Sequence, residues 1–474
     1  MTFLGKEEIE RIHRASMRIL GEIGIKVHSD KVSRILIEAG AVRTEADNRL
    51  RIPEHVVKAA LASAPKSVLL AGRNGVKDIR IPDPKRMYVA TGGTGVYITD
   101  LVKGTSRKPT LKDLHDITVI ADYLQQIDFF WQLVSAQDLP DEKTSDLIEM
   151  KTVLENTCKH IQSGSLSALG AKREIEMASI IVGGEKALAK RPILSAVECP
   201  FSPLAFEGGL SEAQVVYAKA GIPVVSMSAA MAGLTSPVTI SGTIAQINAE
   251  NMASLVITQG ANKGAPWIYS SDSVPANLRR GTIDYGALEA NLMLTAAAEM
   301  ARFYGLPVMC GGVGLGGNAA DLRCIADGVP IMLNQALVPS DLGSGFGGLD
   351  NALGASIEGI IVDAWVWDVA RESIKEFDMD DDAISVETIS EGAKDGNFLT
   401  KKHTLARFRK ELSTASHPEA TSSLKGEKNI PGAVAKKAQR EVKDILRAHK
   451  EPVLARDISK ELDAVIDRAR KEGK

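Results

Sequence analysis

The chain has 474 residues, which is long enough for one large core or for two to three domains. Its 57 basic and 60 acidic side chains leave a net charge of -3, so nothing in the charge balance predicts nucleic acid or an anionic membrane as a partner. No apolar run reaches the roughly 18–20 residues that a membrane span needs. The charged N-terminus also lacks the apolar stretch of a signal peptide. We therefore expect a cytoplasmic protein.

Residues 1–85 are predicted to form a mainly helical N-terminal segment. Apolar residues recur at helical spacing from Glu7 to Gly24, and that glycine ends the pattern. A second helix is expected over 30–39, and a third should follow Pro53, which suits the first position of a helix.

From about residue 86 onward, a short apolar run that ends in glycine or small polar residues is repeatedly followed by a helical stretch. The runs cover residues 87–91, 127–135, 160–164, 192–198, 222–228, 265–271, 306–311 and 336–342. Strands that alternate with helices imply a parallel sheet in an α/β fold. A count near eight favours a (β/α)8 TIM-type barrel over residues 86–375, with an open doubly wound sheet as the alternative.

The composition changes after about residue 376. An acidic stretch is followed by a basic one, and Lys, Glu, Arg and Ala dominate the last fifty residues. We expect residues 376–474 to form a charged helical C-terminal extension that packs on the barrel or on a second subunit. A solvated charged face without a specific partner is the alternative.

Gly312, Gly314 and Gly317 have the G-x-G-x-x-G spacing of a dinucleotide-binding turn. Such a turn normally opens a βαβ unit, whereas these glycines follow the seventh predicted strand, so we do not expect a nucleotide enzyme. Further glycine clusters at 91–95 and 343–348 also follow predicted strands. Together they indicate a barrel with a wide carboxyl end that admits a large group.

Several long segments resemble the trimethylamine:corrinoid methyltransferase family, in the branch that lacks pyrrolysine and includes glycine betaine methyltransferases. The segments that carry the resemblance are 12–29, 92–114, 199–204, 220–256, 285–307, 347–363 and 396–409. The resemblance implies a (β/α)8 barrel that passes a methyl group to a corrinoid held by a small partner protein, with no cofactor bound tightly to this chain. It also implies a homo-oligomer.

Family members that act on trimethylamine carry pyrrolysine in a segment that aligns near 318–322. Here the loop around it, with Gly316, Gly317 and Asn318, contains only ordinary residues. A reduced corrinoid can demethylate a quaternary ammonium group without acid assistance, because the amine departs neutral. The resemblance therefore implies a quaternary amine such as glycine betaine, proline betaine or carnitine.

The methyl donor should be held by aromatic faces and, for a betaine, by an arginine. Candidate aromatic residues near the predicted strand ends are Trp131, Trp267, Tyr269 and Phe346. Arg279 stands where relatives carry an arginine, in Leu-Arg-Arg-Gly, and is the candidate for the carboxylate. Asn318, Asp321 and Asp341 are further candidates for the substrate site. An acid there favours the bound cation over the neutral product, so we expect these acids to be set back or paired.

Two other functions remain open at this point. A zinc-dependent corrinoid methyltransferase acting on a thiol or alcohol would need converging Cys and His ligands. Cys158 and His160 could supply half of such a site, but no convincing set exists, and a buried structural role is expected for this pair. A non-catalytic barrel that binds a betaine is the other alternative. We assign no catalytic side chain and no metal site.

Overall fold

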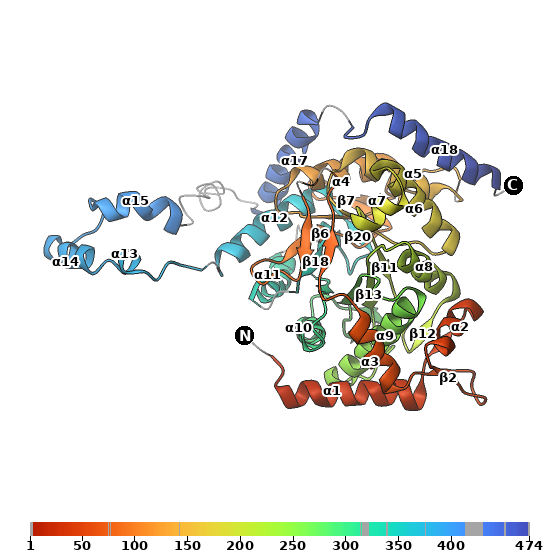
Figure 1. Ribbon diagram of the computed structural model, residues 1–474. Helices are drawn as coiled ribbons and strands as arrows, with labels where there is room; N and C mark the ends of the chain where they lie inside the picture. The colour runs from red at the N-terminus through yellow and green to blue at the C-terminus, as the bar shows by residue number, and fades with distance from the viewer. Residues whose placement is uncertain are drawn as a thin grey trace.

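The computed structural model describes residues 3–73, 75, 77–141, 143–312, 314, 322–337, 340–374, 376–412, 430–449 and 452–472. Within these residues, eight parallel strands form one sheet in the order β6-β18-β17-β14-β13-β11-β10-β9. A parallel bridge from Ala90 to Phe129 joins the two ends of this order, so the sheet closes into a ring (Figure 1). The predicted α/β barrel is confirmed.

The barrel strands lie close to the predicted positions for seven of the eight runs. They are β6 (Tyr88–Thr91), β9 (Phe130–Trp131), β10 (Ile161–Ser163), β11 (Leu194–Glu198), β13 (Val224–Ser228), β14 (Trp267–Ser271), β17 (Val308–Cys310) and β18 (Leu342–Phe346). The helices around them are α4 (Leu111–Tyr123), α5 (Ser145–Asn156), α6 (Ala168–Val182), α7 (Glu185–Lys190), α8 (Gly208–Lys219), α9 (Ile240–Ala261), α10 (Leu288–Phe303), α11 (Leu322–Leu337) and α12 (Ile357–Glu372).

The prediction for the eighth strand is wrong. Residues 336–337 end helix α11, and the strand runs from Leu342 to Phe346. Two of the four glycines of the 343–348 cluster, Gly343 and Gly345, therefore lie inside β18, where Gly343 pairs with Val89, and not in a loop after it. Glycine is disfavoured in strands on propensity alone, and tertiary pairing overrides that preference here.

The N-terminal segment covers the outside of helix α9. Helices α1 (Lys6–Arg18), α2 (Asp30–Glu38) and α3 (Glu54–Ser63) occupy the predicted positions and pack on α9, and a π-helix (Ile19–Ile23) continues α1 up to Gly24. Because α9 lies between these helices and the barrel, its residues from Thr243 to Gln259 are all buried. A helix that is buried all round needs partners for its polar groups. Asn251, for example, donates to the carbonyl of Ser270 on β14 (2.9 Å).

A hairpin from the N-terminal segment closes the amino end of the barrel. Strands β4 (Val68–Leu70) and β5 (Ile79–Ile81) pair antiparallel. Their apolar side chains join the interior cluster that includes Phe129, Met309 and Leu342. Ala71 donates its backbone N–H to the carbonyl of Pro192, just ahead of strand β11, which places the hairpin at the amino end.

The C-terminal extension has two parts. Helices α17 (Ile430–Ala448) and α18 (Arg456–Glu472) pack on the barrel helices, α17 against α12 and α4 and α18 against α5 and α6. Between α12 and α17, the short helices α13 (Asp381–Ile384), α14 (Val386–Asp395) and α15 (Lys402–Glu411) reach away from the body (Figure 1). Among the described helices, none has the length and apolarity that crossing a membrane requires.

The closing hairpin should contribute strongly to stability. Ile79→Ala removes a side chain that is 3% exposed inside the barrel, and we expect a loss of about 2–5 kcal/mol in the free energy of unfolding. Arg80→Ala, on the exposed face of the same strand, is the matched control and should change it by less than about 0.5 kcal/mol. Chemical denaturation followed by tryptophan fluorescence measures both. Equal effects of the two substitutions would contradict this role for the hairpin.

Candidate active site at the carboxyl end of the barrel

Strand residues alternate between the barrel interior and the surrounding helices. The interior cluster contains Ala90, Phe129, Val225, Met227, Ile268, Met309 and Leu342, with Trp131 and Val197 packed against it. Steps of two from these residues give the inward positions just beyond the strand ends, which are Gly92, Cys199, Ala229, Asp272 and Gly311. Most of these positions carry little or no side chain. The inward groups of interest at the carboxyl end are therefore the indole of Trp131 and the carboxylate of Asp272.

Asp272 is the inward acid of this set, and a tyrosine from the following loop holds it. The hydroxyl of Tyr285 donates to Oδ2 of Asp272 at 2.5 Å. Burial raises the pKa of Asp272 to about 6, although the Tyr285 hydrogen bond works in the opposite direction. The pKa of Tyr285 is raised well above its ordinary value by burial and by the neighbouring carboxylate. At neutral pH the pair is thus an ionised carboxylate and a protonated phenol.

Two glycines make room for the site side chains. A Cβ atom on Gly311 would lie 2.1 Å from Oδ1 of Asp272. A Cβ atom on Gly92 would lie 2.5 Å from Cε3 of Trp131, and the φ of Gly92 is also positive. The clusters at 91–95 and 311–317 therefore begin with glycines that permit close approach of a site residue. Beyond Gly312, all of the second cluster except Gly314 lies outside the described residues.

Trp131 and Asp272 lie on opposite sides of the ring. Strand β9 carries Trp131 and is four places from β14 in the ring of eight strands. Trp131 is half-buried, and its neighbour in register on β10 is Gln162, which also points inward because Ile161 beside it belongs to the helix-side core. The two side chains therefore stand next to each other across from Asp272.

Two buried polar groups inside the barrel have no hydrogen-bond partner among the residues that the structure describes. One is the side-chain amide of Gln162, whose nitrogen and oxygen both lack a partner. The other is the hydroxyl of Ser270, the inward residue two positions before Asp272. A buried polar group that remains unpaired costs about 1–3 kcal/mol. Such groups at a strand end indicate a ligand that supplies the missing hydrogen bonds.

Glu250 is a second acid near the site, and its surroundings differ from those of Asp272. Glu250 on α9 is fully buried and accepts hydrogen bonds from the hydroxyls of Ser202 and Ser228, the backbone of Leu204 and the amide of Gln246. It ties the loop after β11 and the last residue of β13 to the helix, so its role is structural.

The Cys199 thiol also lies near Asp272. Desolvation by the surrounding protein is the main effect that raises the pKa of this thiol to about 12, and the negative charges of Glu198 and Asp272 act in the same direction.

The structure removes Trp267 and Tyr269 from the substrate site. Ile268 between them points into the barrel, so both aromatic rings point outward, where they are fully buried and contact each other edge to face. The Trp267 indole lies 3.5 Å from the hydroxyl of Ser254 on α9. The prediction that Trp267 and Tyr269 bind substrate is therefore wrong. Alternate residues of a strand face opposite sides, and in β14 the interior side is that of Ile268.

Phe346 and Asp341 are also displaced from the expected site. A bulge between Ser344 and Phe346 shifts the alternation of β18, and Phe346 is fully buried in the helix-side core. Asp341 precedes β18, so it lies at the amino end of the barrel, where its Oδ2 accepts a hydrogen bond from the backbone of Val308 at 2.8 Å. Burial raises the pKa of Asp341 to about 6. Neither residue lines the carboxyl end.

Arg279 is exposed in the hairpin of β15 (Ala276–Asn277) and β16 (Thr282–Ile283), which follows β14 at the carboxyl end. Its role toward a substrate carboxylate stays a prediction. Asn318, Asp321, Gly316 and Gly317 lie outside the described residues.

The C-x-H pair has a structural environment. His160 is fully buried, with Nε2 at 2.9 Å from the hydroxyl of Ser195 and Nδ1 at 3.3 Å from the carbonyl of Ala71 in the closing hairpin. Burial lowers the pKa of His160 to about 3. Within the described residues, no three His, Cys, Asp or Glu side chains converge as metal ligands would.

A family model described as trimethylamine methyltransferase (MTTB) matches residues 1–474. The chain belongs to this family. Trimethylamine methyltransferase of Methanosarcina barkeri is 29% identical over 473 residues, which cover 98% of this chain and 94% of that protein. Glycine betaine methyltransferase of Desulfitobacterium hafniense strain Y51 is 27% identical over 414 residues, or 87% of this chain and 85% of that protein.

A solved structure supports the fold of this MTTB-family chain. The crystal structure of the Methanosarcina barkeri monomethylamine methyltransferase superposes with a TM-score of 0.56 over 94% of this chain and 88% of that one. The two sequences are 12% identical, so this likeness concerns the barrel architecture alone.

Sequence reasoning missed Asp272, Tyr285 and Gln162. Asp272 directly follows a correctly predicted strand, and a charged residue at that position of a barrel is itself a signal of a functional site. Gln162 lies in a weak predicted strand, and its unpaired amide could be recognised only from the packed structure. Tyr285 contacts Asp272 from a loop 13 residues further along the chain, and sequence spacing does not predict this contact.

The Asp272–Trp131 arrangement should bind quaternary cations in a pH-dependent way. The affinity for glycine betaine should fall as the pH drops through about 6, because protonation of Asp272 removes the charge that faces the ammonium group. Asp272→Asn should weaken binding about tenfold or more at pH 7.5 and should abolish the pH dependence.

Isothermal titration calorimetry from pH 5 to pH 8 measures this effect. Glu289→Gln, at an exposed position of α10, is the matched control and should retain the wild-type pH profile. The uncharged isostere 3,3-dimethylbutyrate should bind weakly to both variants. A betaine affinity that is independent of pH in the wild type would exclude Asp272 from the cation site.

Proposed function

We propose that this chain transfers a methyl group from a small quaternary amine to a corrinoid carried by a partner protein. The observation that carries the proposal is the pair of Trp131 and Asp272, an indole and a carboxylate, both half-buried, that face the same barrel opening in a member of a methyltransferase family. Aromatic faces attract quaternary ammonium groups by about 0.5–2 kcal/mol each. A carboxylate that is partly withdrawn from water adds a negative charge that a bound cation compensates.

The titration of Asp272 favours a quaternary donor over a tertiary amine. The thiol of Cys199 and the phenol of Tyr285 have raised pKa values and are weak acids, and Asp272 is mostly ionised at neutral pH. Of these three groups only Asp272 has a pKa in the range of a general acid, and its ionised form, which would hold the cation, cannot at the same time give a proton to a leaving amine. A quaternary ammonium donor releases a neutral tertiary amine and requires no proton.

The unpaired groups inside the barrel favour a betaine over a simple ammonium ion. The amide of Gln162 stands beside Trp131, and the hydroxyl of Ser270 lies below Asp272. Either group can donate a hydrogen bond to a carboxylate on the same small molecule that carries the ammonium group. Glycine betaine, proline betaine and carnitine meet this requirement, whereas tetramethylammonium and choline carry no carboxylate. Arg279 in the adjacent hairpin is a further candidate for the same carboxylate.

The corrinoid, when bound, supplies the reduced metal centre that accepts the methyl group. The residues at the carboxyl end fit a bulky group that approaches from solvent, because Gly92, Ala229 and Gly311 leave the inward positions nearly free of side chains. The chain's own contribution is to hold the ammonium group between Trp131 and Asp272, with one methyl group directed outward.

The loops around this opening present an apolar rim that fits a protein partner. Its members are exposed side chains from the loops and helix starts that follow the barrel strands: Val96, Leu166, Phe201, Leu234, Val238, Leu278, Leu288 and Leu353. Exposed apolar patches of this kind on a soluble protein mark interaction sites. Because the rim surrounds the opening, a protein bound to it would present its cofactor to the substrate.

The direct test uses chemically reduced cobalamin, cob(I)alamin, as the methyl acceptor. The purified chain should convert it to methylcobalamin, seen by absorbance, with one or more betaines and not with trimethylamine. Choline and tetramethylammonium should be poor donors, and Asp272→Asn should raise KM about tenfold or more. Absence of turnover with every quaternary amine, or turnover with trimethylamine, would overturn the proposal.

The rim should act on the protein partner alone. Leu166→Ser with Leu278→Ser removes side chains that are 80% and 67% exposed. The rate at sub-saturating concentrations of a corrinoid protein that accepts methyl groups from the wild type should fall about tenfold or more. The rate with free cob(I)alamin should not change. Val42→Ser, at an exposed apolar site of the N-terminal segment, is the matched control. Equal loss with both acceptors would place these leucines in the substrate site instead.

A further inference from the structure

A short hairpin follows strand β18 at the carboxyl end of the barrel. It is formed by β19 (Gly348–Leu349) and β20 (Gly354–Ala355), which pair antiparallel, and its tip consists of residues 350–352. Strand β20 also pairs in parallel with β7 (Tyr97–Asp100), which follows the glycine cluster at 91–95 (Figure 1). The hairpin therefore belongs to the loops that surround the opening.

We infer that Asn351, in the tip of this hairpin, is a positioning residue for the proposed methyl transfer. Its Oδ1 accepts a hydrogen bond from the backbone N–H of Tyr285 (3.1 Å), and the hydroxyl of Tyr285 donates to Asp272 (2.5 Å). Asn351 thus acts on the cation site through Tyr285, by holding it where its phenol reaches the carboxylate. The inference deepens the proposed function and rests on it.

The backbone of the tip is strained. Asp350, Asn351 and Ala352 have φ angles of 47°, 55° and 65°, so three consecutive residues other than glycine adopt the left-handed conformation. Glycine adopts this conformation without strain, whereas Asp and Asn tolerate it less well and Ala is disfavoured in it. Such residues persist where surrounding contacts hold them in place, and they are concentrated at functional sites. The side chains of Asp350 and Asn351 supply such contacts on the two sides of the tip.

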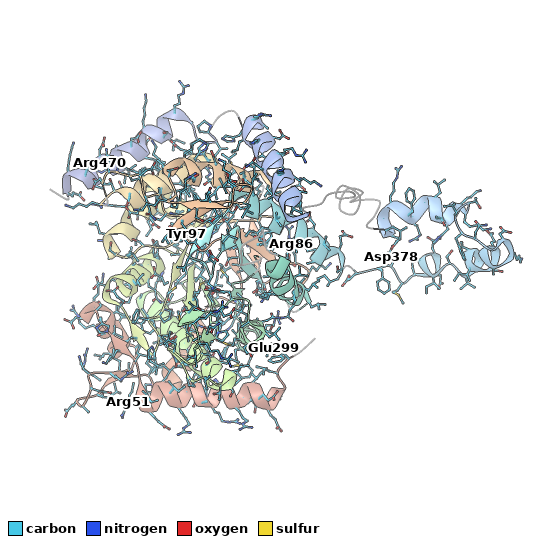
Figure 2. All side chains as sticks on the ribbon, turned by 180° about the vertical axis from the view of Figure 1, so that it is seen from behind. Arg51, Arg86, Tyr97, Glu299, Asp378 and Arg470 are labelled. Carbon is cyan, nitrogen blue, oxygen red and sulfur yellow. The ribbon has the colours of Figure 1, made fainter. Side chains whose placement is uncertain are left out.

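Asp350 anchors the tip to β7. Its carboxylate accepts a hydrogen bond from the hydroxyl of Tyr97, and burial together with this bond raises the pKa of Tyr97 well above its ordinary value. The Tyr97 ring lies against Gly354, where a Cβ atom would be 2.5 Å from Cε2 of the ring. Val96 donates its N–H to the carbonyl of Leu353 (2.8 Å). Because Tyr97 lies within the body of the protein, these contacts give the tip a firm support (Figure 2).

Asn351 meets Tyr285 on the other side of the tip. Tyr285 follows the largely exposed hairpin of β15 and β16, whose base is closed by a hydrogen bond from the N–H of Asp284 to the carbonyl of Pro275 (3.1 Å). This excursion separates Tyr285 from Asp272 by 13 residues of chain. Holding the phenol at the carboxylate therefore requires a fixed point beside Tyr285, and Asn351 supplies it from a different loop of the barrel.

The position of Tyr285 affects the pH range over which Asp272 is charged. The hydrogen bond from Tyr285 lowers the pKa of Asp272 and so opposes the larger effect of burial. The other titratable groups whose charges interact with Asp272 are the thiols of Cys199 and Cys310, and their raised pKa values keep them neutral at neutral pH. Loss of the Tyr285 hydrogen bond should therefore raise the pH below which Asp272 is neutral. Betaine binding, which needs the charge, should then be lost at a higher pH.

The test compares Asn351→Gly with Ala352→Gly by calorimetric titration of glycine betaine from pH 5 to pH 8. Both substitutions relieve left-handed strain in the tip, and the first also removes the acceptor for the N–H of Tyr285. Asn351→Gly should raise the pH midpoint of betaine binding by about one pH unit. Ala352→Gly is the matched control and should keep the wild-type midpoint.

Tyr285→Phe tests whether Asn351 acts through Tyr285. This variant should also raise the midpoint, and the double variant Asn351→Gly with Tyr285→Phe should show no rise beyond that of Tyr285→Phe alone. Additive rises would contradict a route through Tyr285. A purely structural role of Asn351 would change the melting temperature and leave the midpoint of Asn351→Gly at the wild-type value, and that result would overturn the inference.

Crystal structures of the variants without substrate separate this inference from the proposed function. A wild type that binds no betaine would contradict the proposed function, but the distance from the Tyr285 hydroxyl to the Asp272 carboxylate remains measurable. In Asn351→Gly this distance should lengthen beyond about 3.5 Å. In Ala352→Gly it should stay at the 2.5 Å of the wild type. An unmoved Tyr285 in Asn351→Gly would overturn the inference whether or not the wild type binds betaine.

Discussion

Closure of the eight-stranded ring is the constraint on which the rest of this molecule depends. Once Ala90 and Phe129 join the two ends of the sheet, alternate residues of every strand must enter the interior. The lower interior is filled by apolar side chains and by the β4–β5 hairpin. The carboxyl end is thereby left as the place where inward residues are free to serve a ligand, and the indole of Trp131 and the carboxylate of Asp272 lie there.

The same closure explains the polar residues of α9. This helix is covered on both sides, by the barrel and by the N-terminal helices, and its polar groups are used as ties. Glu250 joins the loop after β11 and the end of β13 to the helix, and Asn251 holds the end of β14 two residues before Asp272. The N-terminal segment therefore supports the site without touching it, because it keeps α9 rigid behind the strands that carry the functional residues.

The order and positions of most elements could be predicted from the sequence, because glycine and proline mark the ends of nearly every strand and helix. The orientation of side chains could not. A shift of one residue in strand phase exchanges Ile268 for Trp267 and Tyr269 as the inward group, and apolar runs do not reveal that phase. The bulge between Ser344 and Phe346 lies at Gly345, whose φ is positive. Glycine inside a strand is a signal of a bulge, but that signal is usable only when the strand itself is correctly placed, and here the predicted strand ends at 342. Asp272 is different, because its position directly after a predicted strand is enough to make it a candidate site residue. In the sequence, aromatic residues were selected for the cation, and Asp272 was not considered.

The Asp272 carboxylate has opposite effects on substrate binding and on methyl transfer, and its hydrogen bond with Tyr285 moderates both. A fixed negative charge stabilises a bound quaternary cation, but that cation loses its charge as the methyl group leaves, so the same charge opposes transfer. The hydrogen bond from Tyr285 occupies one carboxylate oxygen and draws part of the charge toward the phenol, which weakens its attraction for the cation. The pKa of about 6 shows that burial is not fully compensated, and a bound cation relieves that cost. The site therefore combines enough charge to select a cation with a hydrogen bond that limits how firmly the cation is held.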